Sequence, residues 1–558
     1  MNIREVTYHG HILAYRYPWI TVIFTLIANV PFLCNSAYVP VKTLYDVVDE
    51  VVILDNDTFK DTVFSSQQAW FVQFYSSWCG HCVQFAPTWK AFAKDIKSWQ
   101  EFVKLGAINC ADKQNLKTCK QYIDRGFPTL RFFKVLLTNE TGEISKGPRD
   151  ITSLRHSLID HMTSHAQDVL PFHWPALSSV TMNWLTNWFS RKDRKSSKML
   201  AVILEEEVSY IGREVIMDMA NRPDIQVVRL LKQEAITSAI ASKWKVKEYP
   251  SLFILKDLDE SLELLRSGTR EKFTMVLQNY ASKSGEETRS PANSGVVEEK
   301  DRNNATQGSQ HDDYVANYHV KNTAARSMVY MQDLESALIY SLAYEISLQS
   351  QINGDALTAL KTYIAVLNKY FPGRPHVMEI LASLHQVLQT YTHVSNEQWT
   401  RMLQYPQRTQ ESFLQNDVEW VGCQGSTAVY RGYPCGLWLL FHTLTVSHAS
   451  MAAASPRLDA KEVLHAMRDY IHYFFGCREC SVNFQKESAS LDSDVKTLVD
   501  SVLWLWKTHN RVNKRLSGKL SEDPQHPKIQ FPSHADCNSC HHFDASSDWN
   551  TQDVLSYL

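Results

Sequence analysis

The sequence predicts a multidomain chain with two α/β units in its N-terminal half and an all-α C-terminal half. Three observations support this prediction. At 558 residues the chain is too long for a single hydrophobic core. Segments with the patterns of strands and helices alternate up to about residue 282. A stretch almost without large apolar residues follows at 283–313, and helical periodicity dominates beyond it.

The overall composition is that of an ordinary globular protein. Hydrophobic residues make up 44% of the chain and charged residues 21%. The formal net charge of -3 gives no reason to expect a nucleic-acid partner.

Residues 1–37 have the order of a secretory signal peptide. Arg4 and Arg16 precede an apolar run at 19–33, and small residues follow at 36–37. The run is short for a membrane span, although an uncleaved anchor is the alternative. Since no second apolar run of sufficient length follows, we expect no stable membrane span after signal removal.

The cysteine pattern agrees with a secreted protein. Of the 11 cysteines, Cys34 would leave with the signal peptide, and every other cysteine has a near neighbour in sequence. Even counts and close pairing in a secreted chain indicate disulfides. The sequon residues Asn56, Asn139 and Asn304 are compatible with glycosylation.

A zinc site is the alternative explanation for two of the pairs. Cys477/Cys480 and Cys537/Cys540 could together supply four thiolates. The separation between the two pairs exceeds that of ordinary zinc ribbons, and an oxidising compartment disfavours free thiolates. We therefore expect disulfides and no metal.

The first α/β unit is expected at residues 43–165. Its apolar runs predict four strands and two helices, of which the second is interrupted by Pro87 and expected to bend there. The predicted strands are 51–54, 69–75, 103–109 and 130–133, and the predicted helices are 58–65 and one that carries Phe85, Trp89, Phe92 and Ile96.

The sharpest motif in this unit is Cys79-Gly80-His81-Cys82, placed where a buried strand runs into a helix. At a helix N-terminus the Cys79 thiolate would lie near unpaired N–H groups, and His81 adds a second favourable charge. Cys79 would exchange with substrate and Cys82 would resolve the mixed disulfide. Pro128, expected in the cis form, and His81 would shape the substrate groove. A purely structural disulfide is the alternative.

The second α/β unit, at 170–282, is expected to be a copy of the first without redox activity. Strands are predicted at 198–204 and 226–231, and the aromatic-Pro-hydroxyl-Leu element at 127–130 recurs at 249–252. Glu205 and two further glutamates stand where the cysteines of the first copy would be, and the unit contains no cysteine.

The C-terminal half is divided into a helical module at 314–397, a second helical domain at 398–542 and a tail at 543–558. Aromatic, histidine and asparagine side chains cluster around the cysteines of the second domain, which suits a flat cofactor with polar edges. Taken singly, each of these residues is better explained by core packing or by a surface position.

These motifs resemble a known family. Residues 474–480 (Phe-Phe-Gly-Cys-Arg-Glu-Cys), 509–513 (His-Asn-Arg-Val-Asn) and 537–540 (Cys-Asn-Ser-Cys) are similar to an Erv flavoprotein domain. The first α/β unit resembles thioredoxin and protein disulfide isomerase. An active thioredoxin domain, an inactive one and an Erv domain in this order resemble quiescin sulfhydryl oxidase over roughly residues 45–542.

The resemblance implies a bound FAD and assigns roles to particular residues. Cys480 would face the flavin and Cys477 would exchange with the thioredoxin pair, whereas the module at 314–397 would be a degenerate copy without flavin. Some relatives carry Trp at the position that matches Phe531. The residues expected to line FAD are Arg431, Trp438, His442, Glu479, Asn483, Trp506, His509, Asn510, Val512, Asn513, Lys528 and Phe531.

The remaining cysteine pairs are expected to have other roles. Cys110 and Cys119 bracket a loop and the start of a helix, which favours a structural disulfide. By the resemblance, Cys423 with Cys435 is also structural. Cys537 with Cys540 matches a third pair in the family whose role the sequence leaves open.

The expected function is a thiol oxidase that introduces disulfides into reduced or unfolded secretory proteins. Electrons would pass from substrate thiols through Cys79/Cys82 and Cys477/Cys480 to FAD and oxygen, giving hydrogen peroxide. We expect a secretory location, either the Golgi or the extracellular space. The rival hypotheses are an isomerase without flavin and a non-enzymatic thioredoxin-fold binding protein whose disulfides are only structural.

Overall fold

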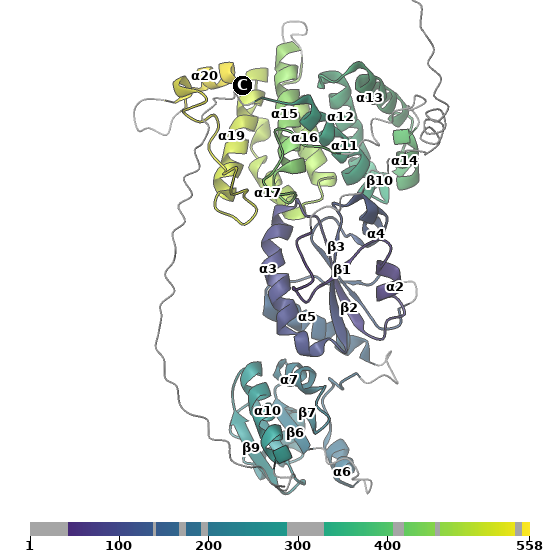
Figure 1. The fold of residues 1–558 in the computed structure, drawn as a ribbon, viewed down its shortest axis with the longest axis vertical. Coiled ribbons are helices and arrows are strands. Elements are labelled where there is room, and N and C mark those ends of the chain that lie inside the picture. The colour runs from purple at the N-terminus through teal and green to yellow at the C-terminus, as the bar shows by residue number, and fades with distance from the viewer. Residues whose placement is uncertain are drawn as a thin grey trace, which may run out of the picture. The chain divides into compact units, whose positions relative to one another are not determined.

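The computed structural model describes most of the chain from residue 43 onward (Figure 1). The described residues are 43–137, 141–166, 174–190, 199–286, 328–404, 418–451, 458–541 and 549–558. The predicted signal peptide with Cys34, the sequon residues Asn139 and Asn304, and positions 287–313 of the predicted linker lie outside them. Among the described helices, none is both long and apolar enough to cross a bilayer.

The first α/β unit is a five-stranded sheet in the order β1-β3-β2-β4-β5. Strands β1, β3 and β2 are parallel, and β4 and β5 are antiparallel to their neighbours. Figure 1 places α3 and α5 on one side of this sheet and α2 and α4 on the other. The elements are β1 (Val52–Leu54), α2 (Phe59–Val63), β2 (Ala69–Tyr75), α3 (Gly80–Asp95), η1 (Lys97–Trp99), β3 (Val103–Asn109), η2 (Lys113–Asn115), α4 (Leu116–Tyr122), β4 (Thr129–Phe133), β5 (Glu143–Ile144) and α5 (Ile151–Ser164).

This architecture confirms the predicted thioredoxin-like α/β class. Strand β2 is buried at every position, which explains its nearly continuous run of apolar and aromatic side chains. Helix α3 begins directly after Cys79 and continues through Pro87 to Asp95 as a single helix. The predicted redox motif therefore lies at the C-terminal end of the central strand and at the N-terminus of a long helix.

The second α/β unit has a four-stranded sheet in the order β7-β6-β8-β9, with β6 and β7 parallel and the others antiparallel. Its elements are α6 (Met182–Ser190), β6 (Met199–Glu205), α7 (Ile211–Met219), β7 (Ile225–Leu231), α8 (Lys232–Thr237), α9 (Ile240–Lys243), β8 (Ser251–Leu255), β9 (Ser261–Arg266) and α10 (Arg270–Glu286).

A buried carboxylate replaces the redox motif of this second copy. Glu205 ends β6 and is fully buried. Its carboxylate accepts hydrogen bonds from the Gly212 N–H at 2.8 Å and the Ser209 hydroxyl at 2.6 Å, and it pairs with Arg229. The carboxylate thus accepts a hydrogen bond from a free backbone N–H at the N-terminus of α7, the place at which the first copy carries its thiols.

Buried ion pairs join the two α/β units. The Arg270 guanidinium of the second unit lies 2.7 Å from Asp218 Oδ2 of the same unit and 2.8 Å from Asp95 Oδ2 of the first. Arg155 of the first unit bonds to Asp95 and to Glu214 of the second. Since Arg270 and Asp218 are both 7% exposed, removal of one partner leaves an uncompensated buried charge.

Replacement of Arg270 by alanine is expected to destabilise the junction strongly. We expect the free energy of unfolding of these two units to fall by about 3–5 kcal/mol, because the buried Asp218 loses its cation and Asp95 keeps only Arg155. Chemical denaturation followed by tryptophan fluorescence measures the change. The matched control is Arg266→Ala, which removes an exposed pair with Glu263 and is expected to cost less than about 1 kcal/mol.

The C-terminal half is helical, as predicted, apart from a two-stranded antiparallel ribbon of β10 and β11. Its elements are α11 (Met331–Ile339), the π-helical η4 (Tyr340–Glu345), η5 (Ile346–Leu348), β10 (Gln351–Asn353), α12 (Gly354–Tyr370), α13 (Pro375–Leu388), β11 (His393–Ser395), α14 (Asn396–Gln404), α15 (Gly432–Ser450), α16 (Glu462–Tyr473), α17 (Arg478–Glu487), α18 (Leu491–Asp494), α19 (Leu498–Leu516), η8 (Asn538–Cys540) and α20 (Thr551–Tyr557).

One hydrophobic core runs through this half. Tyr363 of α12, Phe441 of α15 and Tyr470 of α16 are buried in the same cluster, and their rings contact one another. Helix α15 also packs against α11 and α19. The cysteine-free module at the start of this half and the helices that carry the second redox pair therefore share their packing.

The predicted tail carries a helix, in agreement with the helical periodicity expected toward the end of the chain. Helix α20 begins after Asn550, whose side chain accepts a hydrogen bond from the Asp553 N–H. It packs against α19 and η8, and Val554 is fully buried there. The end of the chain is thus part of the helical half.

Candidate active site

The first redox pair lies at the N-terminus of α3. Cys79 is the N-cap residue, and Cys79 and Cys82 are both free thiols with no exposed surface. Burial raises the pKa of the Cys82 thiol well above its usual value. This arrangement suits a resolving cysteine that stays protonated until it is required to attack.

The second redox pair lies at the start of α17. Cys477 is the N-cap residue of this helix and forms a disulfide with Cys480. Cys477 is fully buried, whereas Cys480 is half-buried. The structure therefore contains a reduced pair in the first α/β unit and an oxidised pair in the helical half.

The backbone brings these two pairs together. The Phe127 N–H, beside the cis peptide bond of Pro128, donates a hydrogen bond to the Gly476 carbonyl at 2.7 Å, and Phe127 forms a bridge with Cys477. A ring nitrogen of His81 and the sulfurs of Cys477 and Cys480 lie within 4.8 Å of one another. Since both sulfurs are in a disulfide, this cluster holds no thiolate for a metal, and the contact is one between redox centres.

Two glycines permit this close approach. A Cβ atom on Gly476 would lie 2.7 Å from the Phe127 ring, and one on Gly126 would lie 2.3 Å from the Gly476 carbonyl oxygen. Gly126 also has φ +122°, a conformation that favours glycine. Gly476 lies in the motif at 474–480, but no role was predicted for either glycine.

Charged side chains surround the same contact. The Glu479 carboxylate pairs with His81 and with Arg149 Nη1, the latter at 2.9 Å, and Arg149 also donates to the Pro128 carbonyl at 3.1 Å. The hydrogen bond from His81 lowers the pKa of Glu479. Glu479 was expected to line the flavin and His81 a substrate groove. The structure brings the two together between the redox pairs.

We expect Glu479→Gln to weaken the contact modestly. The carboxylate is 45% exposed, so its pairs are screened, and we expect transfer between the pairs to slow about two- to fivefold at low salt and less at high salt. The pKa of Glu479 is lowered in the contact, so its contribution is present above the usual carboxyl pKa and is lost as the pH falls through the lowered value. Transfer rates measured against pH and salt test both statements.

Most residues expected to hold FAD come together between α15, α19 and the segment 528–531. The Trp438 and His509 rings stack with centroids 4.1 Å apart, and His442 Nε2 lies 3.1 Å from His509 Nδ1. Burial lowers the pKa of His442 to about 4 and that of His509 well below its usual value. Both imidazoles are therefore neutral near pH 7.

Arg431 and Lys528 place two cations side by side. Burial lowers the pKa of Lys528, and the neighbouring charge of Arg431 lowers it further. Arg431 Nε is buried and has no hydrogen-bond partner among the described residues. Asp333 and Asp523 offset part of this charge, and an anion such as the pyrophosphate of FAD would stabilise the two cations further and give Arg431 Nε an acceptor. The donor set therefore fits the cofactor.

Other predicted flavin residues support the chain around Phe531. Trp506 Nε1 and Asn510 Nδ2 donate to the Phe531 carbonyl at 2.6 and 2.8 Å, and Asn510 Oδ1 accepts from the Phe531 N–H. Asn513 donates to the Ile529 carbonyl at 3.2 Å. Val512 is buried on α19, and Asn483 is half-buried on α17. Their contact with flavin remains a prediction.

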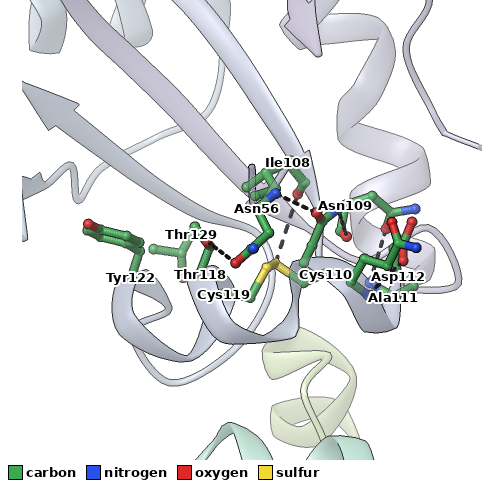
Figure 2. Close-up of a disulfide and its surroundings, with 12 residues drawn as sticks. Asn56, Ile108, Asn109, Cys110, Ala111, Asp112, Thr118, Cys119, Tyr122 and Thr129 are labelled. Atoms are coloured by element: carbon green, nitrogen blue, oxygen red, sulfur yellow. Dashed lines mark hydrogen bonds between the residues drawn. A yellow bond between two sulfur atoms is a disulfide. The ribbon is translucent and has the colours of Figure 1, made fainter. Parts of the chain in front are cut away.

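The other cysteine pairs form three disulfides. Cys110–Cys119 connects the end of β3 to α4, and Cys423–Cys435 connects a loop to the first turn of α15. Figure 2 shows the first of these beside the sequon residue Asn56, whose Oδ1 accepts from Thr118 at 3.0 Å. Cys537–Cys540 lies in η8, packed with Trp506.

Comparisons with known proteins match family models to four successive segments of the chain. A thioredoxin model matches residues 50–160, and a QSOX thioredoxin-like domain matches 171–281. The model described as FAD-dependent sulfhydryl oxidase matches 325–426, and that of the Erv1/Alr family matches 435–532.

Curated proteins are similar over most of the chain. Sulfhydryl oxidase 1 of Cavia porcellus is 38% identical over 92% of this chain and 81% of its own length. The rat and human proteins of the same name are 38% and 37% identical, and the chain spans 64% and 67% of their lengths. The sulfhydryl oxidase fragment of human QSOX1 is a solved structure with 43% identity, covering 42% of this chain and 95% of that one, with a TM-score of 0.39.

Proposed function

The chain belongs to the quiescin family of FAD-dependent sulfhydryl oxidases, and we propose that it carries electrons from protein thiols through Cys79/Cys82 and Cys477/Cys480 to FAD and oxygen. The observation that carries this proposal is the contact between the two pairs, in which Phe127 pairs with Gly476. An isomerase has no need for a contact between its active-site domain and the segment of a second redox pair.

The relay starts at the first pair in its oxidised form. A substrate thiolate attacks Cys79 Sγ, the Cys79–Cys82 bond breaks, and Cys82 leaves as a thiolate that takes up a proton. A second substrate thiolate then attacks the substrate sulfur of the mixed disulfide, and Cys79 leaves. The substrate gains one disulfide, and the enzyme gains two electrons, with a proton on Cys82 and Cys79 released as a thiolate.

The docked arrangement supports the second exchange. The Cys79 thiolate attacks Cys477 Sγ, the Cys477–Cys480 bond breaks, and Cys480 leaves. Cys82 then loses its proton and attacks Cys79 Sγ, which restores Cys79–Cys82 and releases Cys477. Because burial raises the pKa of Cys82, this thiol stays protonated until it attacks.

We propose that Arg431 and Lys528 hold the pyrophosphate of FAD and that Trp438, His442 and His509 contact its rings. When bound, FAD accepts the two electrons of the Cys477/Cys480 dithiol and passes them to oxygen, which gives hydrogen peroxide. The neutral state of the two imidazoles avoids placing further positive charge beside the rings.

Substrates must reach Cys79 in another arrangement of the domains. Cys79 has no exposed surface when the pairs are docked, so a protein thiol cannot attack it there. We propose that the domains separate about the segment 283–313, predicted from its composition to be a flexible linker. The tether keeps the effective concentration of the two pairs high between encounters.

We infer a secretory location, in the Golgi or outside the cell, and substrates that are reduced secretory proteins. The disulfides at Cys110–Cys119 and Cys423–Cys435 support an oxidising compartment, because such bonds seldom persist in the cytosol.

Oxygen consumption with a reduced, unfolded disulfide protein tests the proposed function. We expect one oxygen consumed and one hydrogen peroxide formed for each disulfide made, measured with an oxygen electrode and a peroxide assay. Disulfide reshuffling without oxygen uptake, even after FAD is added, would contradict the oxidase and leave an isomerase.

A further inference from the structure

The helical module at the start of the C-terminal half has no cysteine between residues 328 and 404. It nevertheless contacts the residue that precedes each redox pair, Trp78 and Gly476. Two of its side chains make these contacts, Tyr340 and Glu345, and both belong to the π-helical segment η4. Neither residue was identified from the sequence. Both lie more than 100 positions from their partners, Trp78 and Gly476.

Tyr340 holds the residue that precedes Cys79. Its hydroxyl accepts a hydrogen bond from Trp78 Nε1 at 2.7 Å. The ring is fixed by stacking on Tyr344 and by a contact with Tyr433, with centroids 4.7 and 4.3 Å apart. Burial raises the pKa of Tyr340 well above its usual value, so the phenol stays neutral. The module thus offers a fixed acceptor to the active-site loop of the thioredoxin domain.

Glu345 holds the residue that precedes Cys477. Its carboxyl group is almost fully buried and accepts a hydrogen bond from the Gly476 N–H. Burial raises its pKa to about 8, against the opposing effect of the Gly476 hydrogen bond. Burial and, to a smaller extent, the charge of Glu345 in turn raise the pKa of the nearby phenols of Tyr340, Tyr433 and Tyr470. A carboxyl group that is largely protonated near pH 7 needs no buried cation beside it.

Gly476 transmits this contact to the thioredoxin domain. Its N–H is bound by Glu345, and its carbonyl accepts from the Phe127 N–H. Glu345 therefore orients Gly476, whose carbonyl pairs with Phe127 and which directly precedes Cys477. Two further contacts extend the surface: Lys120 Nζ donates to Asn396 Oδ1 at 3.2 Å, and Leu348 packs on the thioredoxin core.

We propose that the cysteine-free helical module is the docking platform for electron transfer, in which Tyr340 and Glu345 are positioning residues that align Cys79 with Cys477. This inference rests on the proposed relay. Neither residue takes or gives an electron. They act by fixing Trp78 and Gly476, because thiol–disulfide exchange requires the attacking sulfur to approach along the disulfide axis and small misplacements slow such reactions strongly.

The test compares transfer between the pairs with chemistry that needs only the second pair. Flavin bleaching is followed by anaerobic stopped-flow absorbance after mixing with a reduced protein. The same variants are made in a Cys79→Ser/Cys82→Ser background and mixed with dithiothreitol, a small dithiol that can reduce Cys477–Cys480 directly. Flavin content is measured by absorbance for every variant.

We expect Tyr340→Phe and Glu345→Ala to slow Cys79-dependent bleaching at least about tenfold and to leave the dithiothreitol reaction and flavin content unchanged. Glu345→Gln retains an acceptor for the Gly476 N–H and is expected to restore most of the rate. The matched controls are Tyr363→Phe, which loses a buried hydrogen bond to Ser341, and Glu335→Gln, in which a buried carboxylate loses its ion pair with the exposed Arg374. Both are expected to transfer at the wild-type rate.

Wild-type transfer rates in Tyr340→Phe and Glu345→Ala would overturn the platform and leave the relay intact. Equal losses in both reactions, or the same loss in the controls, would also overturn it, since the residues would then serve only the fold. A wild-type protein without Cys79-dependent bleaching would overturn the relay and this inference together.

Discussion

Replacement of Cys79 by serine is expected to lower kcat/KM for a reduced protein substrate at least about 1,000-fold and to leave the flavin bound. Cys79 is the N-cap of α3 and the sulfur that meets both the substrate and Cys477 in the proposed relay. A serine hydroxyl cannot form the mixed disulfide, so both exchanges stop. Oxygen uptake with a reduced protein measures the loss.

Small dithiols separate this loss from a defect in folding. Cys477 and Cys480 remain intact in Cys79→Ser, so dithiothreitol is expected to be oxidised at a rate within a few-fold of the same reaction in Cys82→Ser. A Cys79→Ser protein that oxidises reduced proteins as fast as wild type would show that substrates bypass the first pair.

Substitution of Gly476 by alanine is expected to slow transfer from the first pair to the second about 100-fold. The added Cβ would lie 2.7 Å from the Phe127 ring and 3.1 Å from Glu345 Oε2, so the two segments must move apart. Gly126→Ala should act in the same way from the other side, since its Cβ would lie 2.3 Å from the Gly476 carbonyl oxygen. Anaerobic flavin bleaching by a reduced protein measures both.

Gly354→Ala is the control for these glycines. Gly354 has φ +52°, and no atom lies within 4 Å of its added Cβ, so it tests backbone strain without a clash at the redox contact. We expect it to transfer at the wild-type rate. If Gly476→Ala also transferred at that rate, the docked arrangement would not be the one in which electrons pass.

The elements predicted best from the sequence are those determined by a local pattern of residues. The strands at 69–75 and 103–109 match β2 and β3, because each is a buried apolar run with a turn at both ends. The predicted helix at 58–65 is shorter in the structure, Phe59–Val63, since helix ends depend on caps. The missing cysteines of the second unit were evident, whereas the ion pairs of Glu205 were not.

The site was predictable only in part because much of it is built by contacts between distant segments. Motifs identified the cysteine pairs and the aromatic and histidine residues of α15 and α19. Nothing local distinguishes Tyr340 or Glu345 from other core residues, and their roles arise from partners in other elements. Glu479 lay in a recognised motif, but only the structure places its carboxylate against His81 and Arg149.

The central claim is that electrons pass from Cys79/Cys82 to a bound flavin, and the visible absorption spectrum under anaerobic conditions tests it most directly. We expect the purified protein to show flavin bands that bleach when a reduced protein is added and that persist in Cys79→Ser. A protein that stays colourless after FAD is supplied, or flavin bands that bleach equally fast in Cys79→Ser, would contradict the account.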